Sequence, residues 1–452
     1  MEKLFKLKEN HTDVRTEVIA GITTFMTMAY ILAVNPNILG ASGMDTGAVF
    51  TATALASALA SFLMAAFANL PFVLSAGMGL NAYFAYTVCG SMGYSWNVAL
   101  AAVFVEGLIF ILLSLTNVRE AIFNAIPQTL KIAVSVGIGL FITFIGLQNA
   151  HIVVDSSTLI GMFSFKSSVS TDTFNSEGIT VLLALLGILI TAILVIKGIK
   201  GNILLGILIT WGLGIICQIA GLYVPNPDAG FYSLIPEKII STPASMAPTF
   251  MKLSFDGLKI VDFIVIMMAF LFVDMFDTLG TLIGCASKAD MLDENGKLPK
   301  IRGALLSDAI GTSVGAVFGT STITTFVESS SGIAEGGRTG LTAVVSGLMF
   351  LLSLFLSPIF LTIPSFATAP ALIIVGFLMI QQVTKIDFNN LPEAIPAFIT
   401  IFAMPFMYSI SEGIALGVIS YVVINLIAGN RKKITPLMYV LAILFVVKYI
   451  VL

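Results

Sequence analysis

Long apolar runs separated by short polar turns follow one another along almost the whole chain. Most of these runs hold roughly 18–25 residues, the length that a helix needs to cross the hydrocarbon core of a bilayer. The pattern predicts continuous spans at about 16–35, 47–69, 96–116, 129–149, 179–196, 202–222, 260–284, 303–318, 338–357, 366–383, 393–409 and 412–428. A third span at about 72–90 and a tenth around Glu328 are interrupted by polar residues and glycines, and they bring the expected total to about fourteen.

The stretch Gly319–Val345 lies among apolar segments, yet it is full of Ser, Thr and Gly and carries charged residues. Thr320–Val327 is rich in β-branched residues, which favour an extended backbone. A helix is expected to restart at Glu328, with Thr324 or Thr325 as its cap. Extended backbone at membrane depth is tolerated only inside protein or beside a water-filled cavity. Broken elements of this kind often form the site of a secondary transporter, so we expect Glu328 to lie in a transport site.

A second interrupted segment, Pro71–Tyr86, stands in the first half where the Glu328 stretch stands in the second. Matching interruptions in two halves indicate an internal repeat and point to the binding site of a transporter. With an odd number of spans in each half, about seven, the halves would be inserted with opposite topology. The expected parts are a first repeat at 1–222, an external connecting loop at 223–259, a second repeat at 260–428 and a basic, apolar tail at 429–452.

The positions of the basic residues predict a cytoplasmic N-terminus. If there are about fourteen spans, the basic loops all fall on the side of the N-terminus; they contain Arg119, Lys197, Lys200, Lys297–Arg302, Arg338, Lys385 and Arg431–Lys433. The polar loops 150–178 and 223–258 are then external. The tail Ile434–Leu452 is apolar but carries Lys448, so three placements are open: it crosses the bilayer, lies at its surface or packs on the bundle.

The composition excludes a soluble protein. Of the 452 residues 57% are hydrophobic and only 10% are charged, and the mean hydropathy is +1.01. The net charge of −3 suggests no nucleic-acid partner. The three Cys are scattered and the two His lie far apart, so neither a disulfide framework nor a metal site is indicated. No GxxxxGK[ST] motif is present, so the chain shows no ATP-driven engine.

The eighth span, Phe270–Gly284, carries two carboxylates near its middle. Asp274 and Asp277 are three residues apart and therefore lie on roughly one helical face, with Thr278 and Thr281 on or near it. Carboxylates at membrane depth are costly and are functional candidates by default. The alternative is a carboxylate that packs between helices and bonds a neighbouring Ser or Thr. The sequence does not rank the two Asp residues.

Four other spans carry polar groups of interest. Glu328 offers two acceptor oxygens to a planar base with parallel N–H groups, or it caps a helix. Asn81 follows the Gly77–Gly79 break and either contacts substrate or ties the break together. Glu106 and Asp308 are better explained as buried hydrogen-bonding groups. Because burial disfavours the charged form of a carboxylate, such groups can take up a proton on one side of a membrane and release it on the other. Asp277, Glu328 and Asp274 are the groups expected to couple transport to protons.

At these residues the chain resembles the nucleobase–cation symporter superfamily of uracil and xanthine permeases. It is more similar to the AzgA-like branch of adenine, guanine and hypoxanthine permeases. The resemblance extends over nearly the whole chain, and the pieces that carry it are Arg15–Pro36, Ala76–Tyr86, Phe270–Leu282, Gly319–Val345 and Ala369–Ile380.

The resemblance implies an all-α membrane fold with an inverted repeat and short strands in the third and tenth spans. It also implies a core domain of spans 1–4 and 8–11 and a gate domain of spans 5–7 and 12–14. The purine would lie between the strands and the eighth span. By similarity the substrate-binding residues are Glu328, Asn81, Asp277, Phe326 and Thr281. Thr281 stands where uracil and xanthine members often have His, which favours the purine branch.

The expected function is import of purine nucleobases by proton symport across the plasma (inner) membrane, without a cofactor. The choice among adenine, guanine and hypoxanthine stays open, as does proton or sodium coupling. The gate domain often forms a dimer in the family, so a homodimer is a further expectation. One alternative is a uracil, xanthine or inorganic-anion permease of the same fold, although no Lys or Arg lies in the third, eighth or tenth span. A remote alternative is an intramembrane enzyme, but the paired YD and GxGD signatures of aspartyl proteases are missing.

Overall fold

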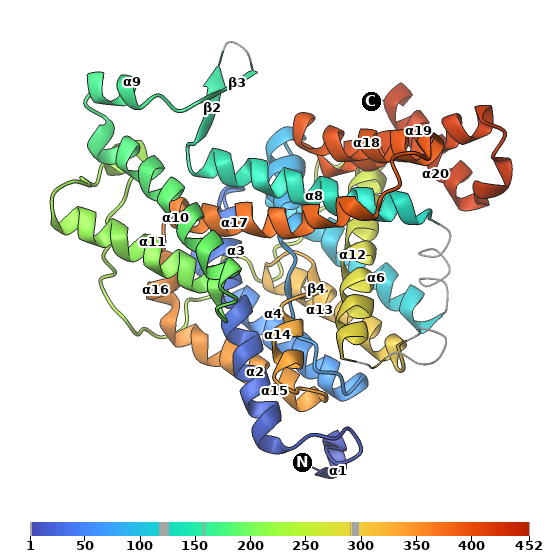
Figure 1. Cartoon of the computed structure of the whole chain (residues 1–452), viewed down its shortest axis with the longest axis horizontal. Helices are drawn as coiled ribbons and strands as arrows, with labels where there is room; N and C mark the ends of the chain where they lie inside the picture. The colour runs from blue at the N-terminus through green and yellow to red at the C-terminus, as the bar shows by residue number, and fades with distance from the viewer. Residues whose placement is uncertain (1, 117–125, 157–158, 290, 292–297, 452) are drawn as a thin grey trace.

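The computed structural model describes residues 2–116, 126–156, 159–289, 291 and 298–451. The chain is almost entirely helical (Figure 1). In the first half the helices are α1 (Glu2–Phe5), α2 (Val14–Met28), α3 (Ile31–Gly40), α4 (Thr46–Phe67), α5 (Met78–Ala82), the π-helix η1 (Tyr83–Ser91), α6 (Trp96–Leu115), α8 (Gln128–Asn149), α9 (Phe165–Ser170), η2 (Phe174–Gly178), α10 (Ile179–Ile196) and α11 (Asn202–Ile219). In the second half they are α12 (Ile260–Lys288), α13 (Ile301–Phe318), α14 (Ser329–Ala334), α15 (Gly340–Ser353), α16 (Ser357–Thr362), α17 (Ser365–Ile380), α18 (Leu391–Phe406), α19 (Ile410–Ile427) and α20 (Pro436–Val451).

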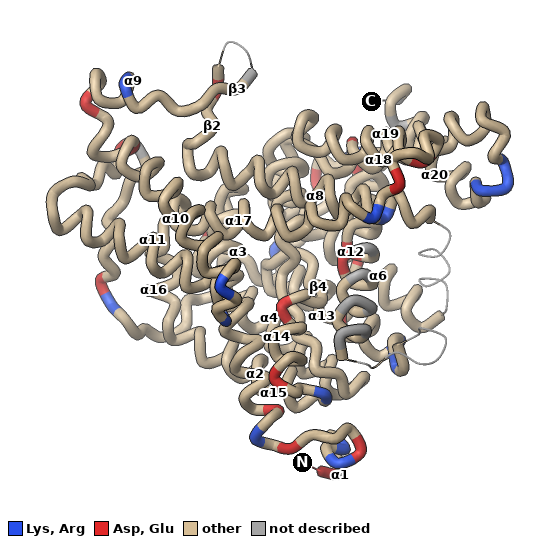
Figure 2. The backbone as a smooth tube through the Cα atoms, viewed as in Figure 1, with Lys and Arg blue, Asp and Glu red and all other residues tan. Residues whose placement is uncertain are grey.

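Ten of the helices or continuous helix pairs in the described part are long and apolar enough to cross a membrane. They confirm a multi-pass membrane protein. The first predicted span corresponds to α2 and α3, which together form one candidate span over Val14–Gly40. The helix is interrupted locally at Ala29 and Tyr30, where both residues keep helical backbone angles. Figure 2 shows that most charged residues lie at the edges of the bundle and in connecting loops, while acidic residues also occur inside it on α12 and near α14.

Two short strands from the two halves of the chain meet inside the bundle. Strand β1 (Leu74–Ala76) pairs antiparallel with β4 (Ile323–Thr325), with Ser75 opposite Thr324. Two further backbone bonds extend the ladder, from the Gly77 N–H to the Thr322 carbonyl and from the Phe326 N–H to the Val73 carbonyl, each 3.0 Å long. The third and tenth spans are therefore both a strand followed by a short helix, as the sequence predicts.

The expected cap of the tenth-span helix is wrong. Glu328 itself stands at the N-cap of α14, and no side chain caps this helix. Thr324 and Thr325 cannot reach that position because both belong to β4, where their side chains are buried.

Hydroxyl groups of the surrounding helices satisfy the backbone of the strands. The Thr312 hydroxyl donates to the Ile323 carbonyl (3.0 Å) and accepts from the Ile323 N–H (3.1 Å). The Val73 N–H donates to the Ser329 hydroxyl at 3.0 Å. A two-stranded sheet leaves outer edges unpaired, and within an apolar bundle these groups need partners. The Ser and Thr content of the neighbouring helices thus makes extended backbone tolerable at this depth.

The long helices pack in two groups. In the first, α13 packs against α4 and α6, and α15 packs against α2 and α4. In the second, α17 lies along α8, while α18 packs on α8 and α19, and α10 packs on α11 and α17 (Figure 1). Small residues permit the close approach of α8 and α17: a Cβ added to Gly376 would lie 2.4 Å from the Gly139 carbonyl oxygen. Helix α12 lies between these groups and contacts both, whereas the strands contact α12 and the first group, chiefly α4 and α13.

The C-terminal tail forms α20 and packs along α19. The Tyr449 hydroxyl, near the end of α20, donates to the carboxylate of Glu412, near the start of α19. The two helices are therefore antiparallel, and the tail packs on the bundle. This packing fits a tail that crosses the bilayer beside α19 as well as one that does not. The outer side of α20 remains apolar and exposed, as at Ile443 and Ile450.

Candidate functional site

Glu328 lies where the strand β4 gives way to the helix α14, and its side chain is half-buried. One carboxylate oxygen, Oε1, accepts a 2.6 Å hydrogen bond from the hydroxyl of Tyr30. Tyr30 is fully buried at the break between α2 and α3. The contact joins the first and the tenth spans, which are 298 residues apart in sequence.

Asp277 faces the same region from α12. Its carboxylate is within side-chain hydrogen-bonding reach of Thr324 in β4 and within electrostatic range of Glu328 and Asp308. Tyr30 in turn lies within electrostatic range of Asp277. The structure therefore brings together Asp277 and Glu328, two of the predicted site residues, beside the hydroxyl of Tyr30.

Asp274 lies one turn before Asp277 and is fully buried. Its Oδ1 accepts from the Thr278 hydroxyl at 3.0 Å, and Oδ1 of Asp308 lies 2.9 Å from the same hydroxyl. The Thr278 hydroxyl thus links Asp274 on α12 with Asp308 on α13. This arrangement also suits a structural carboxylate, and the part of Asp274 in proton coupling stays a prediction.

Asn81 is fully buried in α5, directly after β1. Its Oδ1 accepts from the hydroxyl of Ser321, and its backbone N–H donates to the Gly77 carbonyl at 2.8 Å. Its Nδ2 has no partner among the described residues. Asn81 thus ties the first-half break to the segment that leads into β4. A direct contact with substrate stays a prediction.

Phe326 and Thr281 flank the two carboxylates. Phe326 directly follows β4 and is 6% exposed. Thr281 is half-buried and lies one turn beyond Asp277, on the same face of α12. Both residues are therefore placed on the elements that carry the site, and their substrate contacts stay predictions.

A network of buried polar side chains holds the segment that leads into β4. The Thr322 hydroxyl donates to Glu106 Oε2 at 2.9 Å. The Asn35 amide donates to Thr53 (2.7 Å) and to Thr320 (3.0 Å). These bonds anchor the segment before β4 to α3, α4 and α6, which agrees with a structural role for Glu106.

Sequence reasoning missed Tyr30. It stands in the middle of the first span, six residues before Pro36, and looks like any aromatic residue in a membrane helix. The signal that could have found it is the broken helix itself. Pro36 lacks the N–H that would bond the Leu32 carbonyl, so irregular backbone is expected near this position. Nothing in the sequence alone pairs Tyr30 with Glu328.

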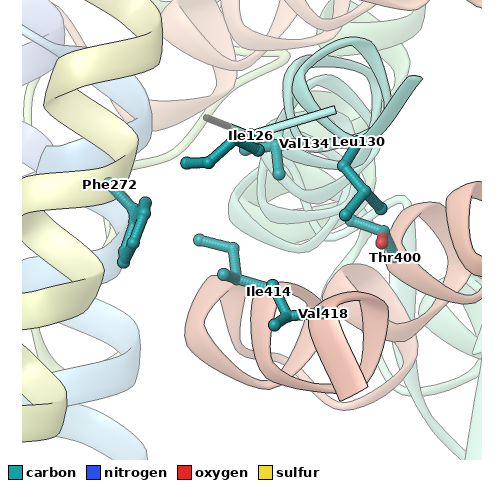
Figure 3. Close-up of a pocket in the computed structure, with 7 residues that line it drawn as sticks. All are labelled: Ile126, Leu130, Val134, Phe272, Thr400, Ile414 and Val418. Atoms are coloured by element: carbon teal, nitrogen blue, oxygen red, sulfur yellow. The ribbon is translucent and has the colours of Figure 1, made fainter. Parts of the chain in front are cut away.

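An apolar gap separates α12 from the second group of helices (Figure 3). It is lined by Ile126, Leu130, Val134, Phe272, Thr400, Ile414 and Val418. Its volume of about 10 Å³ is far too small for an organic ligand. The contact of α12 with α8, α18 and α19 is therefore mostly apolar at this point.

Two broken elements from the two halves, meeting beside carboxylates in an apolar bundle, are typical of a secondary transporter. The chain belongs to the Permease family, whose sequence model matches residues 15–416. It is 43% identical to the guanine/hypoxanthine permease PbuG of Bacillus subtilis over 100% of this chain and 99% of PbuG. It is 41% identical to the adenine permease AdeP of Escherichia coli over 100% of this chain and 96% of AdeP. The resemblance to the purine permeases is thereby confirmed, and the chain is a transporter and not an enzyme.

A similar fold occurs in a bicarbonate transporter. The transmembrane domain of the cyanobacterial bicarbonate transporter BicA superposes with a TM-score of 0.64 at 18% identity, covering 89% of this chain and 97% of that domain. At this identity the likeness describes the fold alone.

Proposed function

We propose that this protein imports purine nucleobases by proton symport. The observation that carries the proposal is the Asp277–Glu328 pair, which faces the junction of the two broken spans beside a tyrosine hydroxyl. Relatives of similar length at 41% and 43% identity are named as adenine and guanine/hypoxanthine permeases. Both the site chemistry and the relatives therefore favour a purine as the substrate.

The chemistry of the site suits a planar base. A carboxylate can accept two roughly parallel N–H bonds, and purines present neighbouring N–H groups on their edges. Phe326, beside the carboxylate, offers a ring for stacking against a flat ligand. No Lys or Arg lies on β1, α5, β4 or α14, nor within the part of α12 that carries Asp274–Thr281. A site without a cation favours a neutral base over an inorganic anion.

The proton coupling follows from burial of the second carboxylate. Asp277 takes up a proton from the external side, where the driving gradient supplies it, and the neutral form removes the repulsion between Asp277 and Glu328. The base then binds to Glu328. Release of the base and of the proton on the internal side returns the pair to its starting state. One base and one proton move together in each cycle.

Alternating access uses the two groups of helices. In the proposed architecture of about fourteen spans, the helices α2–α6 and α12–α15 with the strands form the core, and α8, α10, α11 and α17–α19 form the gate. The side chains around the gap, among them Phe272 and Ile414, are mostly apolar, which favours movement of the two groups past each other at this point. The proposal places the protein in the plasma membrane with a cytoplasmic N-terminus and pairs two copies through the gate.

The test is uptake of labelled hypoxanthine, guanine and adenine in cells that lack their own permeases. Uptake that a protonophore abolishes, and that purines but not uracil or xanthine compete, supports the proposal. Competition by uracil or xanthine would favour the other branch of the superfamily. Protein that reaches the membrane yet takes up no purine would contradict the proposal.

A further inference from the structure

Tyr30, at the interruption between α2 and α3 in the first span, places its hydroxyl beside the Glu328 carboxylate. Helix α2 ends at Met28 and α3 begins at Ile31, and Tyr30 stands between them as the residue that precedes α3. Its side chain is fully buried. Of the described side chains, only that of Tyr30 is recorded as donating a hydrogen bond to the Glu328 carboxylate.

The Tyr30 hydroxyl does more than fill space in the core, because it bonds a carboxylate. A tyrosine hydroxyl donates one hydrogen bond and can accept others through its lone pairs. Here the hydrogen is given to Glu328 Oε1 at 2.6 Å, a short bond of the kind that O–H donors form with carboxylates. Asp277 lies within electrostatic range of the same side chain. The hydroxyl therefore bonds Glu328, the carboxylate expected to bind the base. It also feels the charge of Asp277, the carboxylate expected to carry the proton.

We propose that Tyr30 is a positioning residue that holds the Glu328 carboxylate for the base and couples base binding to the protonation of Asp277. This inference rests on the proposed function of the Asp277–Glu328 site. While Asp277 is charged, its repulsion displaces the Glu328 carboxylate from the position in which Tyr30 bonds it. Once Asp277 is protonated, this repulsion is gone, and the Tyr30 hydroxyl fixes the Glu328 carboxylate, with Oε2 turned to the base.

Other titratable groups face this region and must be counted in any pH dependence. They are Asp274 and Cys285 on α12, Asp308 on α13, Glu106 on α6 and, at the far end of α14, Glu335 and Arg338. Asp274, Asp308 and Glu106 bond to Thr278 or Thr322. The Arg338 guanidinium donates to the carbonyls of Ile333 and Gly337, and Glu335 pairs with Lys200. None of the bonds described here for these groups goes to Glu328. The described side-chain hydrogen bond to the Glu328 carboxylate comes from Tyr30.

The test compares Tyr30→Phe with Tyr421→Phe in purified protein reconstituted into liposomes. Both substitutions remove only a hydroxyl from a buried tyrosine, and Tyr421 lies in α19 beside Glu393, which is not a residue of the proposed site. For Tyr30→Phe we expect the KM for the purine to rise about tenfold, because a hydrogen bond to a charged group is lost, with a smaller change in Vmax. We also expect the KM to lose most of its dependence on external pH. Tyr421→Phe should keep the wild-type KM and pH profile.

A second measurement does not need the substrate. Hydrogen exchange across residues 323–335 reports how firmly β4 and the start of α14 are held. Tyr30→Phe should speed exchange there, and Tyr421→Phe should not. Wild-type KM, pH profile and exchange rates in Tyr30→Phe would overturn the inference. If wild-type protein takes up no purine, the proposed function fails, and unchanged exchange in Tyr30→Phe would then reject the positioning role separately.

Discussion

The two broken spans share one architecture but differ in chemistry. Each is a short strand, β1 or β4, followed by a short helix, and the strands pair with each other. The first-half break carries an amide, Asn81, which is fully buried and bonded to Ser321. The second-half break carries a carboxylate, Glu328, which is half-buried and held by Tyr30. In the proposed site, the first break thus supports the structure and the second break supplies the charge.

If this division is correct, removing the charge of Glu328 in the second break has the largest effect on transport. Glu328→Gln keeps the size of the side chain but replaces one acceptor oxygen by a donor amide, which repels the N–H groups of a base. We expect purine uptake to fall at least about a hundredfold, the effect of losing a buried charge-assisted pair. Uptake and the thermal stability of the purified variant should be measured together. Wild-type affinity in folded Glu328→Gln would remove this residue from the site.

The next largest effect distinguishes the two carboxylates of α12. Asp277→Asn removes a group that can take up and release a proton, so accumulation against a gradient should be lost, while exchange of labelled for unlabelled base persists at a reduced rate. Asp274→Asn should change both less, because the Thr278 hydroxyl can donate to an amide oxygen as well. The two transport modes should be assayed in the same vesicles. Loss of accumulation in Asp274→Asn alone would reverse the assignment.

A smaller effect is expected in the first break. Asn81→Ala leaves the Ser321 hydroxyl without its acceptor in a buried place, which costs about 1–3 kcal/mol of stability. The KM should rise only a few-fold, because the change acts on the base through the frame of the strands. Melting temperature and KM are the measurements. A loss of binding as severe as that in Glu328→Gln would show that the two breaks share the ligand equally.

The smallest effect should follow from a contact at the far end of α14. Lys200 and Glu335 form an ion pair there, between the α10–α11 turn and the end of α14. The Lys200 side chain is 62% exposed, and exposed pairs contribute at most about 1 kcal/mol. Lys200→Gln should therefore alter Vmax by less than about threefold and leave KM unchanged. Initial rates over a range of purine concentrations test this. A raised KM would show that the Lys200–Glu335 ion pair affects substrate binding.

Much of this organisation is visible in the sequence because it depends on local patterns. Apolar length predicts the helices, and the β-branched run before Glu328 predicts β4. The placement of Glu328 and Asp277 on facing elements follows from the resemblance to purine permeases. What the sequence could not supply were contacts between distant segments, such as that of Tyr30 with Glu328. The expected threonine cap failed for a related reason, because pairing of β4 with β1 decides where Thr324 and Thr325 lie.

The most direct test of the account measures proton movement with the base. Purified protein is reconstituted into liposomes that hold a pH-sensitive dye, and hypoxanthine, guanine or adenine is added outside without a prior gradient. The account predicts that the lumen acidifies with purine entry in the wild-type protein and that neither movement occurs with Glu328→Gln. Purine entry without acidification would contradict proton symport, and acidification or entry that survives in Glu328→Gln would contradict the site.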